Sequence, residues 1–266
     1  NSLDIQESNR LSILRILAGE DVLTRAELSR RTGLKQATIT NIINDFLASG
    51  VVSETGALKG NLGRRSIGIR INAEKFNVVA IKIARRSYSV GIFNIKNQLL
   101  EKEYQKLDPA AGASAVLERI VSDARSLMQK YGSCCAVGVA VPGPYLRREG
   151  RIAVMTEFAG WEKIDICKQL GAAFEQPVFV EHDANAGALG EWSRSANIGR
   201  DDVLVHLLAS EGIGAGVVIG GKIISGYRGI FGEIGHMSIN AMGPRCLCGN
   251  RGCLEMYCSA LALVRD

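Results

Sequence analysis

Four potential metal ligands within eighteen residues constrain this chain more than any other feature of its sequence. The stretch from 236 to 255 reads HMSINAMGPRCLCGNRGCLE, in which one histidine and three cysteines follow the spacing H-x9-C-x-C-x4-C. The four residues are His236, Cys246, Cys248 and Cys253. Imidazole and thiolate groups are the ligands of tetrahedral structural zinc, and Gly249 and Gly252 permit tight turns between the thiols. We therefore predict a closed Zn²⁺ site that shapes this loop and leaves no position for a bound water.

Two other interpretations of the cysteines remain, namely buried free thiols or a disulfide within the stretch. A disulfide is disfavoured because no secretory signal is present and the other cysteines show no pairing framework. Those other cysteines are Cys134, Cys135, Cys167 and Cys258. We expect these four to be thiols of the protein core.

The composition is that of a soluble globular protein, with 47% hydrophobic and 22% charged residues. The longest apolar runs, such as 136–141 and 203–208, are far shorter than the roughly 18–20 residues that span a bilayer. We therefore predict no membrane insertion and a cytoplasmic location. The sequence begins without methionine and stops just after a run with helical periodicity at 254–264. We expect it to be a fragment that lacks its carboxyl portion.

The first quarter of the chain has the pattern of a winged helix-turn-helix. Thr24 and Glu27 form a capping box at the start of a helix, and Gly33 permits the turn into the next one. We expect helices at 1–19, 25–32 and 34–49, followed by strands at 51–55 and 67–71 that form a β-hairpin wing. The segment 1–72 holds ten Lys or Arg and seven Asp or Glu, so it carries +3 of the net charge of +5. We predict a DNA-binding domain over 1–72.

The last of these helices has a polar outward face, and two arginines lie near the tip of the wing. We expect contacts to double-stranded DNA from Lys35, Gln36, Thr38, Thr40, Asn41, Arg64 and Arg65. Such a helix places its amino-terminal residues in the major groove, while basic wing residues bind backbone phosphates. The alternative is a protein-interaction module whose polar face is solvated, and the mild net charge does not decide between the two.

From residue 73 onwards the pattern changes to that of an α/β domain, which we predict to extend to 266. We expect strands at 78–84, 88–94, 98–104, 136–141 and 178–181, helices at 114–130 and 164–174 and from 185, and a hairpin of strands at 203–208 and 215–219. The run 136–141 is almost entirely apolar, which predicts a strand buried on both faces. It ends at Pro142-Gly143-Pro144, a loop at the carboxyl end of a strand, where α/β folds place ligands.

Several motifs resemble those of the ROK family of sugar kinases and sugar-responsive repressors. The matching segments are Thr24-Arg25-Ala26-Glu27-Leu28, Gly63-Arg64-Arg65, Glu181-His182-Asp183-Ala184-Asn185-Ala186, Glu233-Ile234-Gly235-His236 and the cysteine loop from Cys246 to Glu255. The resemblance covers almost the whole chain and includes repressors of the xylose, glucose and N-acetylglucosamine type. It implies a winged helix-turn-helix followed by a two-lobed α/β ribonuclease-H-like/actin-like sugar-kinase fold.

The resemblance also implies a sugar pocket. Asp183 matches the position of the kinases' catalytic base, and Glu233, His236 and Glu255 match positions that bind sugar hydroxyls. His182 stands where the kinases carry a sugar-contacting asparagine, so the preferred sugar is expected to differ from glucose. For Asp183 the alternative is a carboxylate that caps the helix beginning at Ala184.

The two phosphate-binding loops of the family's kinases are altered here. The first, an Asp-x-Gly-Gly-Thr motif, reads Lys82-Ile83-Ala84-Arg85-Arg86, and the second, Gly-Thr-Gly, reads Ser210-Glu211-Gly212. Glu211 would place a negative charge beside ATP phosphates, so we predict a chain without enzymatic activity. Arg85 and Arg86 could bind a phosphate group by themselves, so a phosphorylated ligand stays an alternative.

We therefore predict a sugar-responsive transcriptional regulator, a repressor of carbohydrate uptake or catabolism genes. Its expected partners are a double-stranded DNA operator, a monosaccharide effector, a second copy in a homodimer or homotetramer, and in addition a protein partner. The alternatives are an ATP-dependent ROK sugar kinase, which would consume ATP with hexose, and a zinc-responsive regulator, which would lose DNA binding reversibly on chelation.

Overall fold

The computed structural model describes residues 2–58, 66–153, 160–195, 198–199, 201–227 and 229–265. The chain divides into two compact units, which are described separately. Unit 1 comprises Asn1–Val78, Ile92–Leu100 and Tyr131–Cys135, and unit 2 comprises Val79–Gly91, Glu101–Lys130 and Ala136–Asp266. The domain boundary that we predict at residues 72 and 73 stays a prediction.

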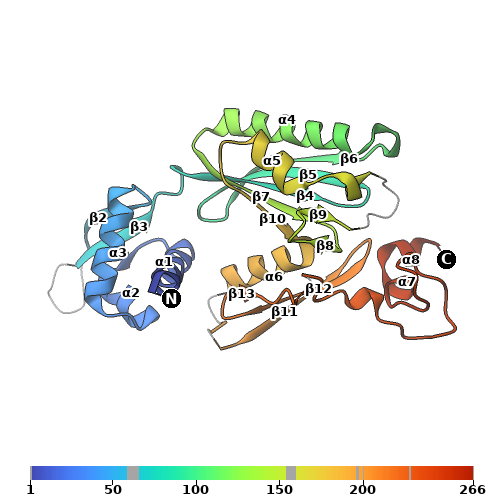
Figure 1. The fold of residues 1–266 in the computed structure, drawn as a ribbon. Helices are drawn as coiled ribbons and strands as arrows, with labels where there is room; N and C mark the ends of the chain where they lie inside the picture. Colours follow the sequence, from blue (N-terminus) through green and yellow to red (C-terminus); the bar gives the residue numbers. More distant parts are fainter. Residues whose placement is uncertain are drawn as a thin grey trace. The chain divides into compact units, whose positions relative to one another are not determined.

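Unit 1 contains the predicted helices and wing strands. The helices are α1 (Ser2–Ala18), α2 (Arg25–Thr32) and α3 (Gln36–Ala48), and the strands are β1 (Leu23–Thr24), β2 (Val52–Leu58) and β3 (Ser66–Ile71), in the sheet order β1-β3-β2 (Figure 1). Apolar side chains from all three helices and the sheet form one buried core, which includes Ile13, Leu28, Ile39, Ile43 and Ile69. This core holds the three helices and the sheet together as one domain.

The capping box at the start of α2 is present. The Thr24 hydroxyl accepts a hydrogen bond from the backbone N of Glu27 at 3.2 Å, and the backbone N of Thr24 donates to Glu27 Oε2 at 2.8 Å. These hydrogen bonds, first among them the one from the Thr24 backbone, lower the pKa of Glu27. Gly33 ends the helix with φ of 71°, a left-handed conformation that glycine adopts without steric cost.

Replacing Thr24 with valine is expected to lower the free energy of unfolding by about 0.5–2 kcal/mol, because valine keeps the shape but cannot cap α2. The lowered pKa of Glu27 stabilises the fold above the pKa of the unfolded chain, and this contribution is lost as the pH falls through the folded pKa. Valine keeps the backbone N–H that is the first cause of this shift and removes only the hydroxyl that also donates to Glu27. The variant should therefore lose slightly less stability than wild type on acidification. Urea denaturation at pH 7 and pH 4 measures both effects. Thr55→Val, in which the replaced hydroxyl lies 3.5 Å from the carbonyl of Gly56 and caps no helix, is the matched control.

The first sheet of the α/β part contains five strands in the order β10-β7-β4-β5-β6. The strands are β4 (Asn77–Ile83), β5 (Ser87–Asn94), β6 (Leu99–Lys106), β7 (Cys134–Val141) and β10 (Val178–His182). Helices α4 (Ala113–Tyr131) and α5 (Ile166–Ala173) lie over the same face of the sheet (Figure 1). β10 runs parallel to β7, with His182 beside Val141, so both strands deliver their carboxyl ends to one edge of the sheet.

The prediction that the apolar run at 136–141 is buried on both faces was wrong. Val137, Val139 and Val141 are buried, whereas the alternating positions Ala136, Gly138 and Ala140 are only half-buried. These three residues have small side chains or none, so their apolar character reflects little side-chain area and does not require full burial.

The second sheet is antiparallel in the order β11-β12-β13, formed by β11 (Val203–Ala209), β12 (Ile213–Ile219) and β13 (Lys222–Ile223). Helix α6 (Asp183–Arg194) packs on β11 and β12. The remaining elements are the hairpin of β8 (Tyr145–Leu146) and β9 (Arg151–Ile152), the 3-10 turns η1 (Pro109–Ala111), η2 (Trp161–Lys163) and η3 (Ile234–His236), and the helices α7 (Glu255–Cys258) and α8 (Ala260–Arg265).

The helical run expected at 254–264 is divided in two. Ser259, between α7 and α8, has an extended backbone with φ of −74° and ψ of 158°. Its hydroxyl accepts a hydrogen bond from the backbone N of Ala262 at 3.1 Å, so the serine caps a new helix instead of continuing the old one. Among the described residues, no helix combines the length and the apolar character needed to cross a bilayer.

Candidate functional site

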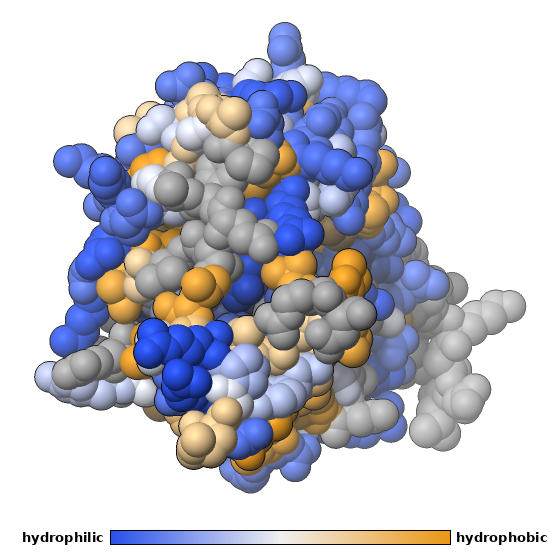
Figure 2. All heavy atoms as spheres, turned by 90° about the vertical axis from the view of Figure 1, so that its right-hand side faces the viewer, coloured by the Kyte–Doolittle hydropathy of each residue, from blue (hydrophilic) through white to orange (hydrophobic). Residues whose placement is uncertain are grey.

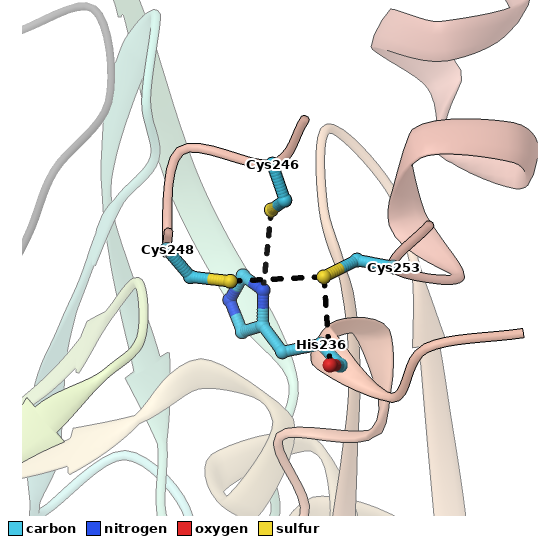
Figure 3. A group of neighbouring side chains, drawn as sticks. All are labelled: His236, Cys246, Cys248 and Cys253. Atoms are coloured by element: carbon cyan, nitrogen blue, oxygen red, sulfur yellow. Dashed lines mark hydrogen bonds between the residues drawn. The ribbon is translucent and has the colours of Figure 1, made fainter. Parts of the chain in front are cut away.

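The predicted zinc ligands converge at the carboxyl-terminal side of unit 2 (Figure 3). His236 lies on η3, and the three cysteines lie on the loop that leads to α7. The four ligand atoms all lie within 4.8 Å of one another. Cys246 Sγ is 3.6 Å from His236 Nδ1, and Cys248 Sγ is 3.6 Å from Cys253 Sγ.

Backbone hydrogen bonds hold this loop in place. The backbone N of Cys246 donates to the carbonyl of Asn250 at 2.8 Å, and the backbone N of Gly252 donates to the carbonyl of Pro244 at 2.8 Å.

Figure 2 looks onto the side of the molecule that carries the carboxyl-terminal helices, where hydrophobic residues form separate patches among hydrophilic ones.

The donor set fits a tetrahedral metal ion. With Zn–S bonds of about 2.3 Å, a tetrahedron has edges of about 3.8 Å, close to the distances found here. Burial raises the pKa of Cys246 and raises the pKa of Cys253 to about 12. Without a cation these thiols would stay protonated, whereas a divalent ion would ionise them and balance their charge. All seven cysteines are free thiols, so the structure contains no disulfide. The prediction that the four cysteines outside the cluster lie in the core was wrong, because Cys135, Cys167 and Cys258 are exposed and Cys134 is half-buried.

The five residues predicted to bind sugar line one pocket in unit 2. They are His182, Asp183, Glu233, His236 and Glu255. His182 and Asp183 lie where β10 ends and α6 begins, Glu233 precedes η3, which contains His236, and Glu255 begins α7, so three separate segments contribute. The sequence marks these residues through family motifs, and the fold brings them together.

His182 lies between two of the carboxylates. Its Nε2 is 3.2 Å from Asp183 Oδ1 and 3.9 Å from Glu233 Oε1. A side chain at Gly143 would place its Cβ 2.5 Å from His182 Nε2 and 2.6 Å from Glu233 Oε1, so a glycine is needed for this close approach. The loop at the end of β7 thereby shapes the pocket.

Burial raises the pKa of Asp183, although His182 and Lys82 oppose the shift. Burial also raises the pKa of Glu233, and the neighbouring Asp183 adds to the effect through charge repulsion. Carboxylates that lose water on burial are strong acceptors for hydroxyl groups entering the pocket. Asp183 Oδ1 also accepts the backbone N–H of Ala184 at 2.8 Å, but Asp183 is the first residue of α6 and His182 is its N-cap, so the helix begins two residues before the predicted start at 185.

Glu255 connects the pocket with the cysteine cluster. Its Oε1 lies 3.5 Å from His236 Nδ1 and 3.6 Å from Cys246 Sγ, while its Oε2 lies 3.5 Å from Arg85 Nη2. Because His236 Nδ1 faces the cysteines, the geometry agrees with an imidazole that gives one nitrogen to the cluster and turns the other away.

Comparison with known proteins assigns both parts of the chain. A sequence model described as "ROK family" matches residues 78–266. The chain belongs to the ROK family. A second model, described as "Winged helix-turn-helix DNA-binding", matches residues 6–53. The predicted family and fold class, a winged helix-turn-helix followed by an actin-like sugar-kinase fold, are thereby confirmed.

Three relatives illustrate the range of the ROK family. The xylose repressor of Bacillus subtilis (strain 168) is 29% identical over 98% of this chain and 68% of its own. A ROK family transcriptional regulator, a homologue of the E. coli MLC protein, has a crystal structure that matches 98% of this chain and 66% of that chain, with a TM-score of 0.76 and 24% identity. A ROK glucokinase from Streptomyces griseus, crystallised with glucose and AMPPNP, matches 71% of this chain and 59% of that chain, with a TM-score of 0.62 and 26% identity. The chain spans about two thirds of the length of the curated relatives it matches.

Three charged residues that were not predicted to bind sugar also line the pocket of this ROK domain. They are Lys82, Arg85 and Glu211. Lys82 is the second-to-last residue of β4, and Arg85 follows the end of that strand by two residues. Because α/β folds place ligands at the carboxyl ends of strands, this position could have predicted that both residues line the pocket. Glu181, the neighbour of His182 in β10, was also not predicted as part of the site. It forms an ion pair with Arg147 and accepts a hydrogen bond from Asn185 Nδ2 at 3.0 Å.

The predicted DNA-contacting residues of the third helix occupy its amino-terminal half. Lys35 precedes the helix, and Lys35, Gln36 and Asn41 are exposed. Thr38 and Thr40 are half-buried, and the Thr40 hydroxyl donates to the carbonyl of Gln36 at 2.9 Å. Arg64 and Arg65 lie outside the described residues, so the wing contacts stay predictions.

Proposed function

We propose that this chain is a DNA-binding transcriptional regulator that responds to a sugar, and that it represses genes of carbohydrate uptake or catabolism. The observation that carries the proposal is the presence, in one chain, of a winged helix-turn-helix and a ROK domain with a pocket lined by carboxylates. The xylose repressor is similar over nearly the whole of this chain, which supports the same class of activity. A cytoplasmic location and a homodimer or homotetramer belong to the proposal.

Helix α3 is the proposed recognition helix. Within the described part of the chain no side chain caps its amino terminus, so its first backbone N–H groups are available to a DNA phosphate. Gln36 and Asn41 are exposed amides, which can form paired hydrogen bonds with adenine in the major groove. Lys35, Thr38 and Thr40 complete this surface, and Arg64 and Arg65 would bind phosphates from the wing.

The ROK pocket is the proposed effector site. Asp183, Glu233 and Glu255 would accept hydrogen bonds from monosaccharide hydroxyls, with His182 and His236 beside them. The sugar regulates DNA binding only if it has different affinities for the DNA-bound and DNA-free states. Zn²⁺ held by His236, Cys246, Cys248 and Cys253 would stabilise the loop that leads to Glu255, which follows the last cysteine by two residues.

Replacing Asp183 with asparagine should raise the melting temperature by a few degrees while weakening sugar binding about tenfold to hundredfold. The folded protein holds the Asp183 proton more tightly than the unfolded chain, so stability falls as pH rises from the ordinary pKa of 3.8 through the raised one. Asparagine removes this penalty but cannot accept a sugar hydroxyl as strongly as a carboxylate does. Thermal unfolding from pH 4 to 8, together with sugar titration, measures both effects. Asp201→Asn, at an exposed position, is the control, and a lower melting temperature for Asp183→Asn would contradict the prediction.

The proposal is tested by selecting duplexes from a random DNA pool with the zinc-loaded full chain. The selected duplex is then titrated by fluorescence anisotropy, with and without each sugar of a panel that contains xylose, glucose and N-acetylglucosamine. We expect one preferred sequence and a change of at least tenfold in its affinity with one sugar. Recovery of no preferred sequence would refute the regulator, and a preferred sequence insensitive to every sugar would refute the sugar effector.

A sugar kinase is the second candidate, because Asp183 lies in the pocket at the position that matches the kinases' base. In its phosphate loops Glu211 places a negative charge that opposes ATP phosphates, and Lys82 replaces the aspartate of the kinase motif. Incubation with ATP, Mg²⁺ and the same panel of sugars decides between the two, and formation of ADP would establish the kinase.

A further inference from the structure

We propose that the Glu211 carboxylate serves as a built-in anion in the ROK pocket, so that the pocket accepts uncharged monosaccharides and rejects phosphorylated ones. The inference rests on the proposed sugar-binding function and specifies the charge of the ligand. Glu211 lies in the turn between β11 and β12, and its Oε2 accepts a hydrogen bond from the backbone N of Arg85 at 3.0 Å. Backbone N–H groups in turns bind anions, and this one, just after β4, is already occupied by a carboxylate of the chain.

The side chain of Arg85 is engaged as well. Its Nη2 lies 3.5 Å from Glu255 Oε2, and the two side chains are only 18% and 11% exposed. A Cβ at Gly212 would lie 2.7 Å from Arg85 Nη2 and 3.3 Å from Glu255 Oε2, so this ion pair packs closely against the turn that carries Glu211. The backbone N–H and the guanidinium of Arg85 therefore both face carboxylates of the protein.

The charges of the pocket lining also oppose an anionic ligand. Its described residues include two cations, Lys82 and Arg85, and four carboxylic acids, Asp183, Glu211, Glu233 and Glu255. Lys82 is itself close enough to Asp183 to lower the pKa of that group against the effect of burial. With neutral histidines and ionised acids the lining has a charge of −2, and a phosphate would bring about −1.5 to −2 more.

An uncharged sugar is not repelled by the negative charge of the pocket lining. Its hydroxyls can donate to Asp183, Glu233 and Glu255, so these carboxylates become hydrogen-bond partners instead of repelling the ligand. Binding such a sugar also leaves the Arg85 interactions with Glu211 and Glu255 intact. A phosphorylated sugar that used Arg85 would have to displace Glu211 and leave its charge unpaired in a partly buried site.

The test measures binding of inorganic phosphate to the zinc-loaded full chain by isothermal titration calorimetry at constant ionic strength. Wild type is compared with Glu211→Gln, which removes the charge and keeps the acceptor oxygen, and with Glu211→Gly, which also frees the N–H of Arg85. We expect phosphate affinity to rise in the order wild type, Gln, Gly, with about a tenfold gain or more for Gly. Glu118→Gln removes the same charge from an exposed position on α4 and should bind phosphate as wild type does. Melting temperature and zinc content show that each variant is folded.

Equal phosphate affinity in wild type and both Glu211 variants would overturn the proposal, and so would undetectable binding in all three. Each protein is also titrated with xylose, glucose and glucose 6-phosphate. A wild type that binds glucose 6-phosphate more tightly than glucose would overturn the proposal as well. If no sugar binds to wild type, the proposed sugar effector fails, while the phosphate comparison still decides the role of Glu211.

Discussion

Replacing Cys253 with serine is expected to release the metal and to destabilise the segment from His236 to Glu255. Cys253 is fully buried, and its Sγ lies 3.6 Å from Cys248 Sγ and 3.5 Å from the carbonyl of His236, at the centre of the cluster. Loss of a structural metal is among the few single changes that cost about 4 kcal/mol or more. In a domain of this size that corresponds to a fall in melting temperature of roughly 10 °C. Sugar binding should disappear with it, because Glu255 is two residues away.

Metal content by mass spectrometry, thermal unfolding and sugar titration measure these effects. Cys258→Ser makes the same atomic change five residues later, at an exposed thiol outside the cluster, and should retain metal and melting temperature. Because thiols must lose protons to bind the ion, metal affinity of the wild type should fall as pH falls. A Cys253→Ser protein that keeps one equivalent of zinc would show that the other residues suffice, and the four-ligand assignment would then be wrong.

Replacing Gln36 with alanine is expected to weaken binding to the selected operator by about 1–3 kcal/mol, which is roughly tenfold to hundredfold, and to relax the preference for one base pair. Gln36 is the exposed first residue of α3, where recognition helices contact base edges. Its substitution should hardly change binding to non-specific DNA, because that binding comes from phosphate contacts. Anisotropy titrations on operator and scrambled duplexes separate the two.

Two companion variants complete this experiment. Lys35→Ala should weaken binding to both duplexes alike and reduce the slope of affinity against salt by about one, as expected for a lost phosphate contact. Gln129→Ala, on the exposed side of α4, should leave both affinities unchanged. If Gln36→Ala weakened operator and scrambled DNA equally, Gln36 would be a phosphate contact and another residue would read the bases.

Short-range features of this protein could be predicted from its sequence. The capping box joins Thr24 to a residue three positions later, and Gly33 ends α2, so chain geometry alone determines both. Three of the four ligands in the cysteine cluster lie within eight residues, and the spacing of the fourth allows it to fold back onto them. The pocket residues were identified by family motifs, because nothing in their local periodicity places them together.

Only the tertiary structure decided which distant residues meet. Glu211 and Arg85 are 126 residues apart, and their hydrogen bond exists because two turns from different sheets face the same pocket. The contact of His182 with Glu233 likewise depends on Gly143, in a third segment. Local hydrogen bonding and spacing act over a few residues and are written in the sequence, whereas these contacts depend on how whole elements pack, and packing is set by the entire chain at once.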